Sequence, residues 1–262
     1  MNFELRPFLP ARWSPGPHAQ TLMARAMRSP EGPEYRRERV ETPDGDFLDL
    51  DWAPEPVDGA PIVLVLHGVE GSTKRRYVRN VCRELLSHRV WPVCLNFRGC
   101  SGEPNRKEHF YHSGETGDAR LVLELLQRRY PERRRGALGF SLGGNVLLKL
   151  LGEEPVAAHG LVHCAVAMSV PYDLAAGSRQ LERSAMGRFY TAYFMRSLRD
   201  KVRMKGDRLA GLLDLERVLR TKTIWDFDEF ATAPCADSRA PPGTIKNRAA
   251  APSCPRSRSR RC

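Results

Sequence analysis

The sequence predicts one large domain of the α/β class, built on a mostly parallel sheet that begins with an antiparallel hairpin. Strand-like and helix-like segments alternate over residues 62–170, and such alternation is typical of parallel strands joined by helical crossovers. The segment Ile62-Val63-Leu64-Val65-Leu66 is a continuous aliphatic run, as expected for a strand covered on both faces. We therefore expect residues 62–66 to form the central strand.

The remaining elements follow in order along the chain. Residues 13–30 contain a short helical pattern, and residues 38–50 are typical of a hairpin that turns at Asp44-Gly45. After the central strand the pattern predicts a helix over 76–88, a strand over 90–97, a helix over 115–130, a strand over 136–140, a helix over 145–151 and a strand over 160–170. Residues 178–222 are helical and charged.

Positive charge is unevenly distributed along the 262 residues, whose net charge is +11. Residues 231–262 hold seven basic side chains and one acid, Asp237, and they contain no aromatic residue, no Leu and no hydrophobic periodicity. Such a segment has too little apolar surface to offset the entropy of ordering it. We expect a domain over residues 1–230 and a basic, disordered tail over residues 231–262.

Composition also argues against several classes of protein. No window reaches the roughly 18 apolar residues that a membrane helix needs, and the N-terminus has no signal-peptide pattern, so we expect a cytoplasmic protein without a transmembrane segment. The seven Cys lack CxxC spacing, which favours reduced thiols over a metal site. Basic clusters at 74–76 and 133–135 flank helices and lack interleaved aromatics, so a specific nucleic-acid partner is not expected.

The segment Gly139-Phe140-Ser141-Leu142-Gly143 is a G-x-S-x-G motif between a predicted strand and a predicted helix. This context is that of a nucleophile elbow, in which small residues at 139 and 143 allow a sharp turn that exposes the Ser hydroxyl. The helix N-terminus favours the negative charge that develops during attack. Ser141 is therefore the candidate nucleophile.

A second motif, His67-Gly68-Val69-Glu70-Gly71, directly follows the central strand. On this topology an oxyanion receives one N–H from this loop and one from the residue after the nucleophile, which makes Val69 and Leu142 the candidate donors. His67 precedes the Ser and ends a buried strand, so we expect it, with Gly68, to shape the loop. Polar loops over 96–106 and 111–116 are expected to border the same pocket, and His112 lies in the second of them.

Taken together, five segments resemble the YheT-like branch of the α/β-hydrolase fold, which is related to ABHD1/2/3-type esterases and lipases. They are PGPHAQT at 15–21, HGVEGS at 67–72, NFRGCSGEPNR at 96–106, YHSGET at 111–116 and GFSLGGNVLLKLLGE at 139–153. The resemblance covers residues from about 6 to 230. It implies a serine hydrolase that acts on carboxylic, often lipid-like, esters without a cofactor, with Ser141 as nucleophile, a helical cap over about 172–225 and a pocket-shaping role for His112.

The chain departs from this family at its C-terminal end. The fold supplies its triad in the order Ser, acid, His from loops after its last strands, but the final His here is His163 and no strand-like run follows residue 230. No triad acid or base can be identified, and the last two strands are expected to be missing. A frameshift would produce such a tail; the alternative is a shortened member with a natural basic tail. The leading hypothesis is a catalytically impaired ester hydrolase, and the alternative is a non-catalytic ligand-binding protein of the same fold.

Overall fold

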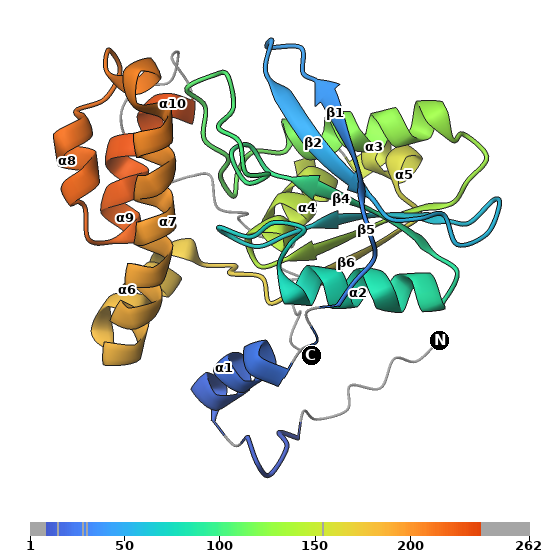
Figure 1. Cartoon of the computed structure of the whole chain (residues 1–262), viewed down its shortest axis with the longest axis horizontal. Helices are drawn as coiled ribbons and strands as arrows, with labels where there is room; N and C mark the ends of the chain where they lie inside the picture. The colour runs from blue at the N-terminus through green and yellow to red at the C-terminus, as the bar shows by residue number, and fades with distance from the viewer. Residues whose placement is uncertain (1–8, 15, 28, 30, 154, 237–262) are drawn as a thin grey trace, which may run out of the picture.

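A six-stranded sheet lies at the centre of the computed structural model, which describes residues 9–236 except 15, 28, 30 and 154 (Figure 1). Its strands lie in the order β1-β2-β4-β3-β5-β6. They are β1 (Arg36–Glu41), β2 (Phe47–Trp52), β3 (Ile62–Leu66), β4 (Trp91–Asn96), β5 (Arg135–Phe140) and β6 (Cys164–Met168). The pairs β1–β2 and β2–β4 are antiparallel and the others are parallel, so the predicted α/β class with an antiparallel N-terminal hairpin is confirmed.

Helices cover both faces of this sheet and form a separate group beside its edge (Figure 1). Those of the first two thirds of the chain are α1 (Pro17–Met27), α2 (Arg76–Ser87), α3 (Gly117–Arg129), α4 (Leu142–Glu153) and α5 (Pro155–Leu161). The second group comprises α6 (Leu174–Arg183), α7 (Ala185–Leu209), α8 (Leu215–Arg220), α9 (Ile224–Phe227), the π-helix η1 (Asp228–Thr232) and α10 (Ala233–Ala236). We refer to α6 to α10, with η1, as the cap.

The alternation of side chains along β3 explains how the sheet is covered on both faces. Ile62, Leu64 and Leu66 point into the larger core, together with apolar residues of α3 and α4. Val63 and Val65 point to the opposite face, where they pack with α2. Because both faces are apolar, β3 has the continuous aliphatic sequence that predicted its central position.

The cap has an apolar core of its own. Met195, Leu198 and Val202 of α7 pack there with Phe227 of α9, and Phe110 reaches the same core from the loop that follows β4. Within the described residues no strand follows β6, and none of the helices combines the length and the apolar character needed to cross a lipid bilayer.

Two of the boundaries that differ from those expected have a clear physical reason. The strand predicted over 160–170 is shorter, because residues 160 and 161 belong to α5 and β6 begins only at Cys164. Residues 231–236, which were expected in the disordered tail, are helical because Ala231 and Cys235 pack against the cap core. The remaining tail residues, 237–262, lie outside the described part of the chain.

Candidate active site

Ser141 lies at the sharp turn between β5 and α4. Its φ is +51°, in the left-handed region that few residues with a side chain adopt. Its N–H donates to the carbonyl of Met168 in β6 at 2.8 Å, and its own carbonyl accepts from Asn145 N–H at 3.0 Å. The main chain of Ser141 is therefore held in a strained conformation by the neighbouring strand and by the first turn of the helix.

Glycines allow this turn to sit against the end of the central strand. A Cβ at Gly143 would lie 2.6 Å from the carbonyl oxygens of both Leu66 and His67. A Cβ at Gly139 would lie 2.6 Å from the amide nitrogen of Gly144. Because all of these neighbours are backbone atoms, the elbow requires glycine at both positions.

The loop over residues 67–71 lies directly beside the elbow. A Cβ at Gly68 would be 3.3 Å from the Cβ of Ser141. Gly71 N–H donates to Gly68 O at 2.9 Å and closes a tight turn, while Gly68 N–H donates to the Tyr77 hydroxyl at 2.9 Å. The two motifs that the sequence singled out are thus brought together.

The candidate oxyanion donors are amides without a partner among the described residues. Among hydrogen bonds between described residues, none uses the N–H of Val69 or of Leu142. Leu142 is the first residue of α4, where an N–H has no acceptor within the helix. These are the two amides that the sequence proposed as oxyanion donors, and one comes from each of the adjoining motifs.

His67 is buried and both of its ring nitrogens are used. Nδ1 lies 2.7 Å from Gly68 O, and Nε2 accepts from Phe97 N–H at 3.2 Å. Burial lowers the pKa of His67 to about 4, so the ring is neutral and donates through Nδ1. This geometry fits a residue that shapes the loop and leaves neither nitrogen for a proton transfer with Ser141.

His112 lies in the loop between β4 and α3. Its Nδ1 accepts from Gly114 N–H at 3.0 Å, and its ring is 6.2 Å from that of His109. Glu115, 3.3 Å from His109, belongs to the same group of side chains. The preceding residue, Tyr111, contacts the loop over 67–71, so the segment that carries His112 is close to the candidate site.

Comparison with known proteins identifies the family to which this chain belongs. The model of the family Hydrolase_4, described as serine aminopeptidase, matches residues 59–213, more than half of the chain. The chain belongs to this family of α/β-hydrolases. The putative esterase YheT of Escherichia coli K12 is 38% identical over 232 residues, which is 86% of this chain and 67% of the relative. The resemblance inferred from the sequence motifs is thereby confirmed.

Other relatives of this α/β-hydrolase are more distant and longer. A monoacylglycerol lipase of Saccharomyces cerevisiae is 30% identical over 76% of this chain and 44% of its own length. The phospholipase ABHD3 of Mus musculus is 28% identical over 86% of this chain and 56% of its own length. The chain therefore spans about half the length of these two relatives. Among solved structures, the Pyrococcus furiosus esterase Pf2001 matches with a TM-score of 0.49 and 23% identity, over 63% of this chain and 66% of that one.

The sequence did not single out several residues that surround the loop of this hydrolase. Tyr111 stacks on Phe97 with ring centroids 5.2 Å apart, and its hydroxyl is hydrogen-bonded to Glu70. Lys201 of α7 reaches the same carboxylate at 2.7 Å. Three of the family segments contain members of this group, namely Glu70, Phe97 and Tyr111, whereas nothing in the local sequence of α7 marks Lys201.

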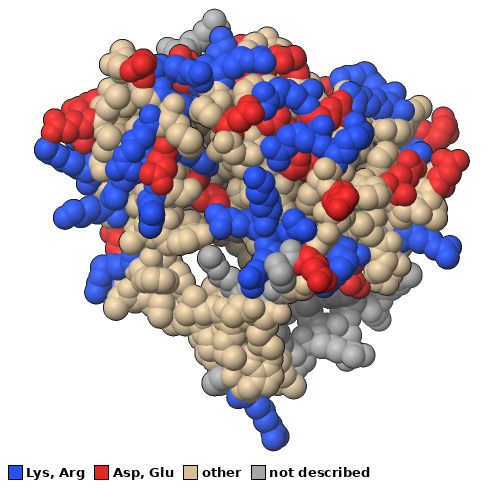
Figure 2. Space-filling model, in the orientation of Figure 1, with Lys and Arg blue, Asp and Glu red and all other residues tan. Residues whose placement is uncertain are grey.

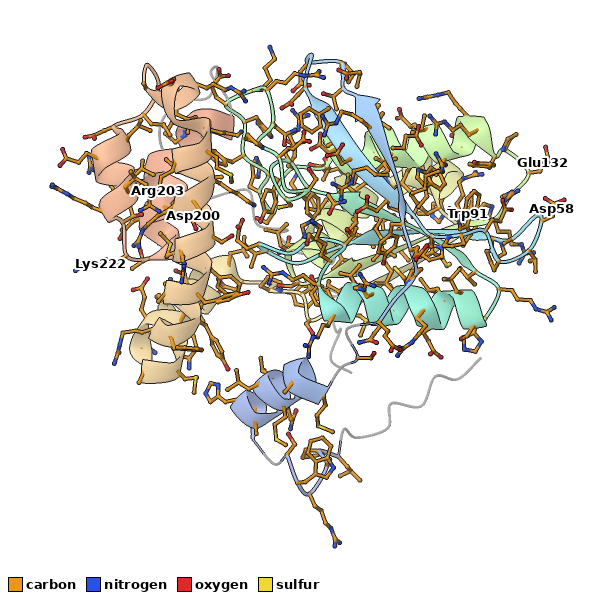
Figure 3. The ribbon with its side chains drawn as sticks, viewed as in Figure 1. Asp58, Trp91, Glu132, Asp200, Arg203 and Lys222 are labelled. Atoms are coloured by element: carbon orange, nitrogen blue, oxygen red, sulfur yellow. The ribbon has the colours of Figure 1, made fainter. Side chains whose placement is uncertain are left out.

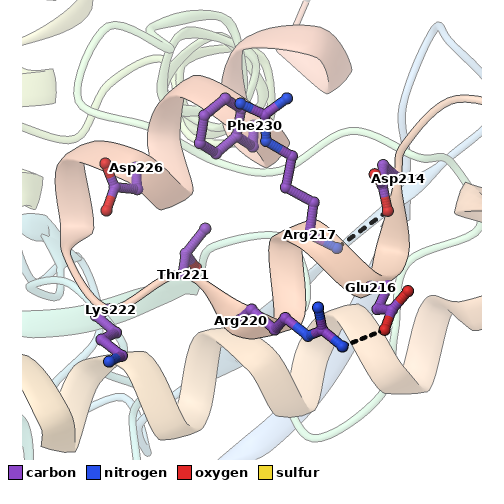
Figure 4. A pocket seen from close by; sticks show the side chains of 8 residues that line it. All are labelled: Asp214, Glu216, Arg217, Arg220, Thr221, Lys222, Asp226 and Phe230. Atoms are coloured by element: carbon purple, nitrogen blue, oxygen red, sulfur yellow. Dashed lines mark hydrogen bonds and ion pairs between the residues drawn. The ribbon is translucent and has the colours of Figure 1, made fainter.

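One surface pocket of the hydrolase lies away from this site. It has a volume of about 450 Å³ and lies on the cap, where α8, α9 and η1 meet (Figure 4). In its lining Arg220 pairs with Glu216, and the Arg217 guanidinium lies 3.8 Å from the ring centroid of Phe230. Ser141 and the two candidate oxyanion donors are not among its lining residues. The candidate site therefore consists of the elbow and its adjoining loop.

Proposed function

We propose that this chain is a serine hydrolase of the carboxylesterase or lipase type, with Ser141 as its nucleophile. The observation that carries the proposal is the strained Ser141 at a strand-to-helix turn, directly beside Gly68 of a second loop. In a nucleophile elbow, the strained backbone conformation serves to expose the nucleophile. The names of the relatives, an esterase, a monoacylglycerol lipase and a phospholipase, support carboxylic and lipid-like esters as the substrate class.

In the proposed reaction, Ser141 Oγ attacks the ester carbonyl carbon and gives its proton to a base from solvent. The electrons of the C=O π bond move to the carbonyl oxygen, which becomes an oxyanion. The N–H groups of Val69 and Leu142 stabilise this charge, as does the N-terminus of α4. Collapse of this intermediate expels the alcohol, which takes up a proton, and water then hydrolyses the acyl-serine. An oxyanion hole of two amide donors needs no cofactor. Gly68, Gly139 and Gly143 contribute by letting these backbone segments approach one another.

We further propose that this polypeptide hydrolyses esters only slowly. A serine hydroxyl is a weak nucleophile and must transfer its proton to a positioned base. The final His of the sequence, His163, has its Nδ1 3.1 Å from Arg135 N, at the start of β5, whereas Ser141 follows the end of that strand. His163 therefore lies at the N-terminal end of β5, whereas the nucleophile lies at its C-terminal end.

Covalent labelling tests the nucleophile. The purified chain is incubated with an alkyl fluorophosphonate, and the modified residue is located by peptide mass spectrometry. We expect slow modification of Ser141, accelerated by free imidazole acting as a substitute base, and none in Ser141→Ala. Ser169 is a matched control, because it also follows a strand and has a φ of +54°. Ser169→Ala should label as the unaltered chain does.

Steady-state assays with p-nitrophenyl esters test the impairment. We expect kcat below about 1 s⁻¹, the low end for ordinary enzymes. A higher value would contradict the impairment and would identify His112 as the next residue to replace. No labelling of Ser141, even with imidazole, would contradict the nucleophile assignment and would favour the non-catalytic ligand-binding alternative.

A further inference from the structure

A buried ion pair joins the cap to the loop over residues 67–71. Lys201 Nζ lies 2.7 Å from Glu70 Oε1, with side-chain exposures of 9% and 1%. Ser197, one turn earlier in α7, donates its hydroxyl to Glu70 Oε2. Both oxygens of this carboxylate are therefore bound by the same cap helix.

The backbone of Glu70 is fixed as well. Its N–H donates to the Tyr111 hydroxyl at 2.7 Å, and that hydroxyl donates to Glu70 Oε1 at 2.8 Å. Arg75 Nη2 donates to the Glu70 carbonyl at 2.6 Å. Glu70 has a φ of +51°, which is unusual for a residue with a side chain. Such strain persists where the surroundings over-determine it, and here every polar group of Glu70 has a partner.

The surroundings of Lys201 keep its ammonium charged and in place. Burial opposes the charge, but Cys100 and Glu70 hold the pKa of Lys201 above its ordinary value. Nζ lies 2.9 Å from Cys100 Sγ and 4.8 Å from the ring centroid of Tyr111. Tyr111 and Cys100 follow β4, so Lys201 connects three segments that are distant in sequence.

We propose that Ser197 and Lys201 are positioning residues for the oxyanion hole. They hold the carboxylate of Glu70, and Glu70 fixes the turn that contains Val69. The N–H of Val69 has no partner among the described residues, and its neighbour Gly68 lies beside Ser141. This inference rests on the proposed role of Val69. Misplacing a catalytic group by about 1 Å can reduce a rate by as much as about 10²-fold. The cap is thus a structural part of the site that stabilises charge.

The chain offers matched controls on the same helix. Lys205 is buried one turn after Lys201, and its Nζ donates to the carbonyls of Lys107 and His109 at 2.7 Å each. Asp200 and Arg203 also lie on α7 and form an exposed ion pair at 2.7 Å (Figure 3). Lys205→Met tests the loss of a buried Lys, and Asp200→Asn tests the loss of an ion pair, without removing a partner of Glu70.

Two measurements on the full chain test the proposal. The first is hydrogen exchange of the amides at 67–71, which we expect to accelerate about tenfold in Lys201→Met because the loop loses a tertiary anchor. The second is binding of an alkylboronic acid, which forms a tetrahedral anion on a serine hydroxyl. We expect Lys201→Met to weaken this binding about tenfold, part of the 10²- to 10³-fold effect of losing one oxyanion donor. Ser197→Ala should change both in the same direction, whereas the two controls should leave both within about twofold.

A double variant separates positioning from the burial of a charge. Glu70→Gln combined with Lys201→Met leaves no unpaired buried charge, so overall stability should recover relative to Lys201→Met alone. Boronate binding should remain weak, because the loop is still not anchored. Unchanged loop exchange in Lys201→Met, equal acceleration in Lys205→Met, or full recovery of binding in the double variant would each overturn the proposal. Failure of the unaltered chain to bind the boronate would instead contradict the assignment of Ser141 and Val69.

Discussion

At the scale of single residues, Ser141 and Glu70 have nearly the same unusual backbone conformation, each with a φ of +51°. Each lies in a turn bounded by glycines: Ser141 between Gly139 and Gly143, and Glu70 between Gly68 and Gly71. Residues in this region cost about 1–3 kcal/mol each. The backbone conformation at these two positions therefore lowers stability, and it places the Ser141 hydroxyl and the amide of the neighbouring Val69.

The packing at Gly143 yields a prediction. Gly143→Ala should destabilise the fold by about 1–3 kcal/mol, because its Cβ would lie 2.6 Å from two backbone carbonyl oxygens that cannot move independently. It should also slow labelling of Ser141. Urea unfolding followed by circular dichroism measures the first effect.

Gly152, in the same helix, is the control for this change. Nothing lies within 4 Å of a Cβ built there, so Gly152→Ala should stabilise the helix by about 0.5–1 kcal/mol. Equal effects of the two substitutions would show that helix propensity, not the close approach of α4 to β3, determines the response.

At the scale of elements, β6 is one of the two edge strands of the sheet among the described residues. It pairs with β5 on one side, and its side chains are largely exposed, with Val166 at 50% and Met168 at 45%. An apolar edge strand with unpaired N–H and C=O groups is a template for association with another chain. This edge should make the chain prone to aggregation.

A charge on this strand should reduce that association. We expect Val166→Lys to lower the rate of light scattering at 37 °C severalfold, since Lys on an edge strand opposes pairing. Val57→Lys is the control, because Val57 is 42% exposed in a loop. If both variants scatter like the unaltered chain, the edge of β6 is not the site of association.

Much of the α/β part could be predicted because its signals are local. The aliphatic run of β3, the Asp44-Gly45 turn, where Gly45 has a φ of +80°, and the elbow each identify themselves within a few residues. The helical state of residues 231–236 could not be predicted, since it depends on packing against a cap core formed by distant residues. The pairing of Glu70 with Lys201 was missed for the same reason: the two residues are 131 positions apart.

At the scale of the whole molecule, charged side chains of both signs are interspersed over the upper part of the visible face (Figure 2). Beneath the surface, the buried Arg98 binds Asp44, Asp46 and Asp118 at 2.6, 3.1 and 2.8 Å. Although burial opposes it, hydrogen bonds from Thr42 and Arg98 lower the pKa of Asp44 to about 2. A carboxyl with a lowered pKa in the folded state stabilises the fold above its unfolded pKa of about 3.9.

This linkage predicts the acid response. The free energy of unfolding should fall as the pH drops from about 4 to about 2, and Asp44→Asn should make that fall shallower. The effect of Asp228 on the pH dependence of stability has the opposite sign, because burial raises the pKa of its carboxyl to about 6. Its contribution to the free energy of unfolding is present below about pH 4 and is lost as the pH rises to about 6. Asp228→Asn should therefore reduce the pH dependence of stability between about pH 4 and about pH 6. Urea midpoints measured between pH 2 and 7 check both, and identical pH profiles for all three proteins would contradict the linkage.

The strand order also sets the timing of folding during synthesis. β3 pairs with β4 on one side and with β5 on the other. The second edge of β3, which begins at Ile62, therefore stays uncovered until β5, which begins at Arg135, has been synthesised. The N-terminal hairpin likewise joins the sheet only through β4. A ribosome that has made the first half of this chain therefore presents an apolar central strand with one open edge, and such non-local pairing is slow to complete. Chaperone binding to the nascent chain is expected to be strongest before β5 emerges.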